Sequence, residues 1–249
     1  MTIARLTFLI TTLLVSSSIV HAQVVAGWDV EGLDVAETLT GPSYSFSSTS
    51  TAANVTAALT LSSSVNPSTS ADQYGFKVSG GDDGVSATLA TAISDGNYFE
   101  FTLTAATGYE LTLTSIEMNG GATSSGAANV ALLSSVDGFN DSSAIATATE
   151  VNSGTGGFDT DSSGFGNSIT LSGAQYEGLQ AISFRIYGWN ISSGSGVTNL
   201  RSLSGDDLEV FGTVSVSAVP EPSTFALLAG LGALGMVASR RRGRRALVA

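Results

Sequence analysis

Ala181-Ile182-Ser183-Phe184-Arg185-Ile186-Tyr187-Gly188-Trp189 is the stretch that decides the fold of this 249-residue chain, because its side chains alternate in character. Successive side chains of a β-strand point to opposite faces, so the alternation predicts a strand. One face is apolar, with Ile182, Phe184 and Ile186, and the other carries Ser183, Arg185, Tyr187 and Trp189. The apolar face must be covered, which predicts a second layer packed on the sheet that contains this strand.

Similar short runs recur along the chain, separated by clusters of glycine, serine and asparagine, a pattern typical of all-β sandwiches and barrels. Besides Ala181–Trp189, we expect strands at Val24–Asp29, Val55–Leu61, Tyr74–Val78, Tyr98–Thr104, Tyr109–Met118, Val130–Ser135, Ala144–Thr149, Ser168–Ser172 and Asp207–Ser217. About ten strands in one domain predict an all-β fold of two packed sheets, an antiparallel β-sandwich.

Two departures from simple alternation carry information. The run Tyr109–Met118 changes phase after Leu113, which predicts a β-bulge near Ser115. The segment Gly173–Leu179 is expected to form a short helical turn.

Loops too polar and glycine-rich to bury are expected at the ends of the sheets. They are Gly41–Ser50, Ser62–Gln73, Gly80–Gly84, Gly120–Ala127 and Asn152–Gly166.

The N-terminal segment Met1–Ala22 has the composition of a secretory signal peptide. Arg5 precedes an apolar core, and Val20-His21-Ala22 supplies small residues at both positions that determine cleavage. We therefore predict cleavage between Ala22 and Gln23. His21 is the only histidine, so the exported protein has no histidine to act as a general base or metal ligand.

The C-terminal segment has three parts in a fixed order. Pro220-Glu221-Pro222 is followed by an uncharged, largely apolar run over residues 223–239. An arginine cluster then closes it with Arg240, Arg241, Arg242, Arg244 and Arg245. Because arginine resists translocation, the cluster predicts a transmembrane helix whose basic end stays in the cytoplasm. The domain before it is then outside.

This tripartite tail resembles the PEP-CTERM sorting signal of Gram-negative bacteria, which an exosortase recognises and cuts at or near the Pro-Glu-Pro motif. The resemblance implies a precursor held in the inner membrane, facing the periplasm, that is later sorted to the cell surface or extracellular matrix. A plain C-terminal anchor is the alternative. The apolar run is short for a permanent span and is diluted by glycine and alanine, which favours the sorting interpretation. The chain thus divides into a signal peptide (1–22), an exported domain (23–218) and a sorting signal (219–245).

The exported domain is strongly acidic. Of 21 acidic residues only Glu221 lies outside it, and of nine basic residues only Lys77, Arg185 and Arg201 lie inside, so its formal net charge is -17. Nucleic acid is excluded as an expected partner, because binding to phosphate backbones requires clustered lysine and arginine. The chain has no cysteine, which excludes disulfides, thiol nucleophiles and zinc–cysteine sites.

Three segments, Ala26–Asp29, Leu133–Phe139 and Ile182–Trp189, resemble those of a jelly-roll extracellular domain, similar in layout to carbohydrate-binding modules. Such a fold could place Arg185, Tyr187 and Trp189 on the floor of a glycan groove, where rings stack on sugars and the arginine donates to hydroxyl groups. In that arrangement Tyr187→Ala should destabilise the protein distinctly less than Phe184→Ala. The alternative is that the aromatic side chains cover a second layer of core and Arg185 pairs with an acid.

Other candidate sites are two aspartate-containing loops. Asp82 and Asp83 in one, and Asp159 and Asp161 in the other, offer oxygen ligands that suit calcium, although solvated turn aspartates explain both equally well. No other cofactor is expected. No local motif selects a pair of carboxylates for glycoside hydrolysis, and a serine hydrolase would depend on Lys77, the sole lysine.

The sequence therefore predicts a non-enzymatic, exported surface or matrix protein that is sorted by an exosortase. Its expected partners are the exosortase, the secretion machinery, the inner membrane as precursor, and exopolysaccharide or biofilm components to which it binds or among which it packs. The alternative is a glycan-processing hydrolase or lyase on the same β-sandwich.

Overall fold

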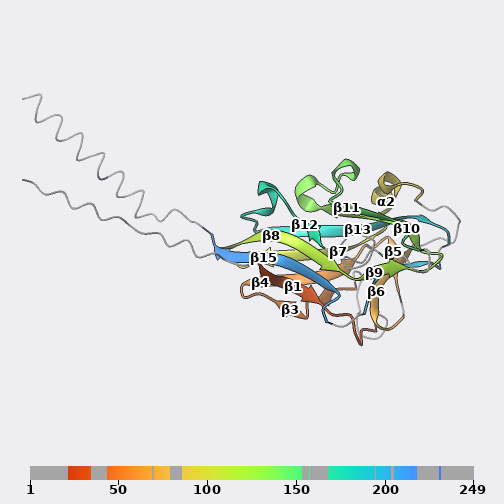
Figure 1. Cartoon of the computed structure of the whole chain (residues 1–249), viewed down its shortest axis with the longest axis horizontal. Coiled ribbons are helices and arrows are strands. Elements are labelled where there is room, and N and C mark those ends of the chain that lie inside the picture. The colour runs from red at the N-terminus through yellow and green to blue at the C-terminus, as the bar shows by residue number, and fades with distance from the viewer. Residues whose placement is uncertain are drawn as a thin grey trace, which may run out of the picture.

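A computed structural model describes residues 22–34, 44–68, 70–78, 86–152, 157, 168–193, 195–202, 205–217 and 230. The fold is mostly β (Figure 1). Its strands are β1 (Gln23–Trp28), β2 (Phe46–Ser47), β3 (Ser50–Thr51), β4 (Val55–Leu61), β5 (Val65–Pro67), β6 (Gln73–Val78), β7 (Tyr98–Ala105), β8 (Tyr109–Met118), β9 (Gly120–Ala122), β10 (Ala127–Ser134), β11 (Ala146–Thr149), β12 (Ile169–Thr170), β13 (Ala181–Ile191), β14 (Val197–Arg201) and β15 (Leu208–Val216). The helical elements are α2 (Leu89–Asp95) and the 3-10 turns η1 (Ser135–Asp137), η2 (Asp141–Ser143) and η3 (Ala174–Tyr176).

The strands form three antiparallel sheets rather than the two that we expected. Sheet A has the order β12-β8-β15-β1-β3, sheet B the order β11-β10-β13-β7-β4-β2, and sheet C the order β5-β6-β14-β9. Sheets A and C meet at Asn119, whose N–H donates to the carbonyl of Asp207 and whose carbonyl accepts from Arg201 N–H. The strand pair β8 and β15 thus continues as β9 and β14.

The main core lies between sheets A and B. Trp28 of β1 meets Phe101 of β7 edge to face, with ring centroids 5.9 Å apart, and Phe101 stacks on Phe184 of β13 at 5.1 Å. The predicted inner face of β13 is confirmed, because Ile182, Phe184 and Ile186 are at most 1% exposed. Phe99 and Leu103 of β7 are also fully buried, as their alternation predicted.

The predicted bulge is present in β8. Phe211 of β15 lies opposite Ser115, whereas the next residue, Gly212, lies opposite Leu113. Thr114 is therefore the extra residue, and it is exposed. The insertion lets Leu113 on one side of the bulge and Ile116 on the other both face the core, as the change of phase requires.

The predicted loops include segments that the structure places in strands. Short strands lie within three of them: β2 and β3 at or beside Gly41–Ser50, β5 in Ser62–Gln73, and β9 in Gly120–Ala127. Gly120 and Gly121 are buried rather than exposed. A Cβ on Gly121 would lie only 2.6 Å from the guanidinium carbon of Arg201, and this close approach, not a solvated turn, accounts for Gly121. The expected turn at Gly173–Leu179 is confirmed as η3.

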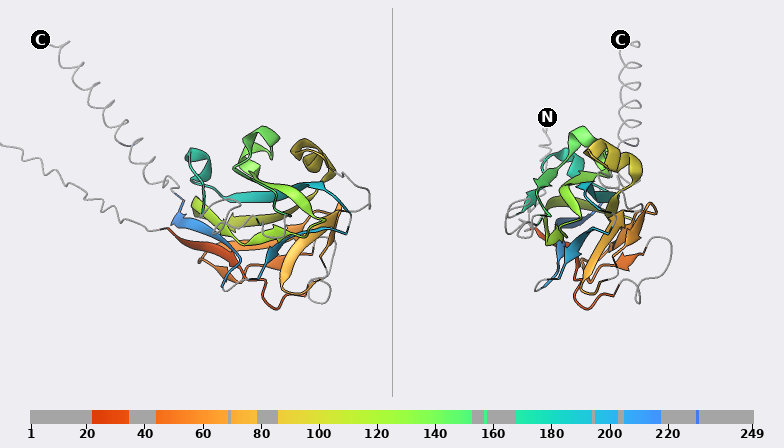
Figure 2. Two further views of the ribbon diagram at one scale, coloured as in Figure 1. Left: turned by 45° about the vertical axis from the view of Figure 1, so that its right-hand side comes forward. Right: turned by 90° about the vertical axis from the view of Figure 1, so that its right-hand side faces the viewer.

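Helix α2 was not among the expected elements, and it covers part of the outer face of sheet B. Thr88 caps its N-terminus through a reciprocal hydrogen-bond pair with Thr91, and Gly96 ends it with a left-handed φ of 74°. Figure 2 shows α2, the η1–η2 segment and η3 in a row on the same side of the molecule. None of the helical segments among the described residues is long and apolar enough to cross a membrane. The predicted signal peptide up to residue 21 and the predicted transmembrane run, apart from Gly230, lie outside those residues.

Candidate functional site

The outer face of β13 does not form the open glycan groove that was one expectation. Tyr187 is fully buried, and Arg185 and Trp189 are only partly exposed. Tyr187 belongs to a second apolar cluster with Ala92 of α2 and with Ala131 and Leu133 of β10. The cover of this face comes from α2 and the η1–η2 segment, so the alternation within β13 could not decide between the open groove and the covered second layer of core.

Arg185 is held by four neighbouring side chains. Its Nε donates to Glu100 Oε2 at 2.6 Å, and its Nη1 donates to the Tyr187 hydroxyl at 3.2 Å. The guanidinium lies 4.2 Å from the ring centre of Tyr98 and 3.8 Å from that of Phe139, within cation–π range. These contacts match the alternative expectation, in which Arg185 pairs with an acid above a second layer of core.

The pKa values of this group follow from the same contacts. Burial alone would lower the pKa of Arg185, but hydrogen bonds with Tyr187 and Glu100 raise it above its ordinary value. Burial also raises the pKa of Tyr187, although the bond from Arg185 opposes this. Both groups keep their usual protonation states at neutral pH, so the cluster works as a structural clamp between β13 and the segment that carries Phe139.

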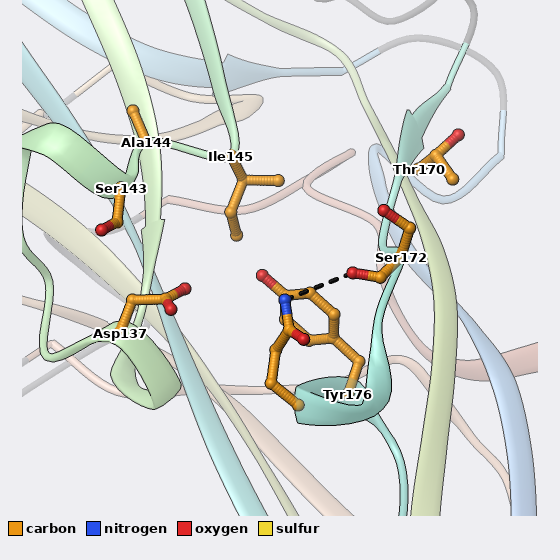
Figure 3. A pocket seen from close by; sticks show the side chains of 8 residues that line it. Asp137, Ser143, Ala144, Ile145, Thr170, Ser172 and Tyr176 are labelled. Carbon is orange, nitrogen blue, oxygen red and sulfur yellow. Dashed lines mark hydrogen bonds between the residues drawn. The ribbon is translucent and has the colours of Figure 1, made fainter.

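A polar pocket lies between the η1–η2 segment and the segment that runs from β12 to η3 (Figure 3). Its volume is about 310 Å³. Figure 3 shows Asp137 and Ser143 on one side, Thr170 and Ser172 on the other, and Ile145 and Tyr176 between them. It is lined by Asp137, Ser143, Ala144, Ile145, Thr170, Ser172, Gln175 and Tyr176.

The floor of the pocket is buried, whereas its rim is in solvent. Tyr176 is 4% exposed and its ring stacks on Phe184, with centroids 6.5 Å apart. Burial raises the pKa of Tyr176, so its phenol stays protonated at neutral pH. Asp137 Oδ2 accepts from Ser134 Oγ at 3.0 Å, and Gln175 Nε2 donates to the Ser172 carbonyl at 3.2 Å. The pocket can therefore offer a carboxylate, several hydroxyl groups and a carboxamide to a ligand.

Sequence reasoning did not single out this pocket. Asp137 and Tyr176 are 39 positions apart in the chain, and nothing local relates them. The available signals were the Leu133–Phe139 segment, on which the jelly-roll resemblance partly rests, and the helical turn predicted at Gly173–Leu179. Both patterns indicate local structure, and neither indicates that the two segments line one pocket.

The expected calcium ligands Asp82, Asp83, Asp159 and Asp161 lie outside the described residues. Within the described part of the chain, no group of three or more histidine, cysteine, aspartate or glutamate side chains is arranged to hold a metal ion. Calcium at those two loops stays a prediction.

The expected sorting residues also lie outside the described ranges, but the strand that precedes them is described. Strand β15 ends at Val216, and Pro220 follows four residues later. Strands β1 and β15 are antiparallel, so β15 ends at the side of the domain where β1 begins (Figure 1). The cleavage site predicted between Ala22 and Gln23 therefore lies at the end of the domain from which the C-terminal tail departs.

Comparison with known proteins identifies this tail. Residues 218–242 match the family model of the PEP-CTERM protein-sorting motif. The match includes Pro220-Glu221-Pro222 and the first three arginines of the cluster, and Arg244 and Arg245 lie beyond it. No curated protein and no solved structure matches the chain. The chain therefore carries the PEP-CTERM sorting motif and is an exported substrate of an exosortase, delivered to the cell surface from a membrane-anchored precursor.

Proposed function

We propose that this protein is a non-enzymatic component of the cell surface or extracellular matrix that associates with exopolysaccharide. The observation that carries the proposal is the sorting motif at residues 218–242, placed directly after the last strand of the domain. The precursor faces the periplasm from the inner membrane, with the arginine cluster in the cytoplasm.

We also infer that the domain is a two-layer, jelly-roll-like β-sandwich. Sheet C continues the strands of sheet A past Asn119, so the two together make one layer and sheet B makes the other. The contact between Trp28 and Phe101 across the core supports this arrangement. The sandwich would act as a compact, acidic body displayed in the matrix.

The pocket beside Tyr176 is the proposed point of contact with glycan. A sugar residue presents hydroxyl groups that both donate and accept, and Asp137, Ser143 and Gln175 supply matching groups. The pocket volume of about 310 Å³ falls at the lower end of the range for small-molecule sites, roughly 300–1,000 Å³, which suits one sugar residue of a longer chain. Since the domain carries a net charge of -17, neutral or cationic polysaccharides are favoured over anionic ones.

Retention on immobilised neutral, cationic and anionic polysaccharides tests the proposal. We expect retention on a neutral or cationic polymer without the appearance of new reducing ends, and reduced retention of Asp137→Asn. Asp141→Asn is the matched control, because Asp141 is an exposed neighbour on η2 that does not line the pocket. New reducing ends would favour a hydrolase, new unsaturated ends a lyase, and equal retention of both variants would place glycan contact elsewhere.

A further inference from the structure

The end of strand β15 holds the sorting motif close to the folded domain. Ser217 N–H donates to the carbonyl of Gly108 at 2.9 Å, so the backbone is still paired at this residue. Only Ala218 and Val219 separate Ser217 from Pro220. Three residue steps span at most about 10 Å, so Pro220 cannot lie farther than this from the sheet while the pairing lasts.

This restriction conflicts with how enzymes bind peptide substrates. A protease or transpeptidase commonly holds its substrate as an extended strand, with main-chain hydrogen bonds over several residues. The apolar run begins just after Pro222, so the residues on the membrane side of the motif belong to the predicted transmembrane run and cannot supply this extended chain. An enzyme in the membrane would therefore need additional extended chain on the domain side of Pro220.

The last residues of β15 are well suited to supply that chain. Strand β1 pairs with β15 only as far as Gly212, which lies opposite Gln23. Among the described strands, only β8 pairs with β15 from Thr213 to Val216. Up to Gly212, in contrast, β15 lies between two strands.

Burial decreases along the same strand. Leu208 and Val210 are fully buried, Val214 is half-buried, and Val216 is 71% exposed. Val216 is the one large hydrophobic side chain that is strongly exposed among the described residues. A segment with few buried apolar contacts and solvent-exposed backbone hydrogen bonds opens at low cost compared with global unfolding.

The start of β8, in contrast, is held from its other side. Leu111 and Leu179 exchange two backbone hydrogen bonds, of 2.8 and 2.9 Å, and Gln180 Nε2 donates to the Tyr109 carbonyl at 2.7 Å. When the two strands separate, β8 therefore stays with the domain and β15 is the strand that leaves.

We infer that release of Thr213–Ser217 from β8 presents the motif to the exosortase, and that this segment binds the enzyme as an extended strand. Release moves the last fixed residue from Ser217 to Gly212. The free chain before Pro220 then grows from three residue steps to eight, or from about 10 Å to about 27 Å. The inference rests on the exosortase route and adds the segment that governs access to the cut.

A disulfide lock tests this inference in the full-length protein in its own host. Because Ser217 and Gly108 form a hydrogen-bonded pair, the next pair, Val216 and Tyr109, is of the non-hydrogen-bonded type. Cα atoms in such pairs are about 4.5 Å apart, within the range that disulfides bridge. The chain has no cysteine of its own, so the bond between Val216→Cys and Tyr109→Cys is the one disulfide that can form within the molecule once it reaches an oxidising compartment.

We expect the cross-linked precursor to accumulate in the membrane and to lose processing, with processing restored by reductant in the medium. Each single cysteine variant should mature as the wild type does. A second form of the locked variant, with eight Gly and Ser residues inserted between Ser217 and Ala218, should mature while still cross-linked, because the insertion restores the reach.

Maturation of the locked protein at the wild-type rate would overturn the inference. The inference would also be overturned if the cross-linked form with the insertion is not processed. The length of free chain before Pro220 would then not be what limits processing. A wild-type protein that reaches the surface with Arg240–Arg242 still attached would instead refute exosortase cutting itself, so the two failures can be told apart.

Discussion

The middle of β13 and the end of β15 are both regular antiparallel strand, yet they differ in what covers them. Phe184 and Tyr187 point to opposite faces of β13, and both are fully buried. Val214 and Val216 share one face of β15, and the exposed fraction of the second is 71%. Backbone pairing therefore defines the bounds of a strand, whereas the burial of its side chains decides how much the strand contributes to the stability of the domain. The contrast matches the proposed roles. The middle of β13 stabilises the domain, and the end of β15 separates from its neighbour so that the exosortase can bind it.

The largest expected effect is that of Phe184→Ala. Phe184 stacks on Phe101 and Tyr176 in the main core, so the substitution removes buried area and leaves a cavity. We expect a loss of about 3–5 kcal/mol in the free energy of unfolding. Denaturant unfolding of the mature exported protein measures it, and a loss below about 1 kcal/mol would show that Phe184 is not a core residue.

Tyr187→Ala should cost nearly as much, which replaces the expectation of a distinctly smaller effect on an open face. Tyr187 packs against Tyr98, with ring centroids 5.0 Å apart, and accepts a hydrogen bond from Arg185. We expect a loss of about 3 kcal/mol by the same measurement. Tyr187→Phe, which keeps the ring, is the control and should recover most of the stability. A small effect of Tyr187→Ala would mean that the cover formed by α2 opens readily.

Arg185→Met should have an intermediate effect. The substitution keeps an apolar stem between Tyr98 and Phe139 but leaves Glu100 without its ion-pair partner. The side chains of Arg185 and Glu100 are 26% and 20% exposed, so water compensates in part, and we expect a loss of about 1–2 kcal/mol. Removing both partners in Arg185→Met with Glu100→Gln should recover part of it, as a double-mutant cycle would measure.

Glu209→Gln probes the well-covered part of β15 through pH. Burial raises the pKa of Glu209, and the charges of Asp206 and Glu117 raise it further. A carboxyl whose pKa rises on folding stabilises the fold below its unfolded pKa and loses that contribution as the pH rises through the folded value. Glu209→Gln should therefore raise Tm at pH 7, and the difference should shrink toward about pH 4.

Glu31→Gln serves as the control for this prediction, because it removes the same charge from an exposed turn. A gain in Tm at pH 7 that is equal in the two variants would point to the overall charge of the domain and not to the surroundings of Glu209.

Val216→Thr should have the smallest effect. Its side chain is largely in solvent and threonine suits a strand equally well, so the free energy of unfolding should change by less than about 0.5 kcal/mol. A loss above about 1 kcal/mol would show that the end of β15 is part of the cooperative core and would weaken the contrast with β13.

The elements that the sequence predicted well are those whose pattern is local. Strands β4 and β8 have the expected bounds, and the bulge at Thr114 follows from the change of phase between Leu113 and Ile116. Strand β9 was missed because its Gly120 and Gly121 have no side chains to alternate, and its pairing with β14 is decided by distant residues. Helix α2 did leave a signal, with Leu89, Ala92 and Ile93 at helical spacing before Gly96, but a helix of seven residues gives a weak pattern.

By itself, the sequence determined the sorting tail and the mostly β class. Both depend on short contiguous patterns, namely the order of motif, apolar run and arginines, and the two-residue period of strands. Only the tertiary structure decided that the outer face of β13 is covered, that a pocket forms beside Tyr176, and that β15 pairs with β8 alone after Gly212 among the described strands. The burial of a sheet face, the presence of a cavity and the length over which two strands pair all depend on which distant segments meet. The two-residue period of one strand does not indicate which segments those are.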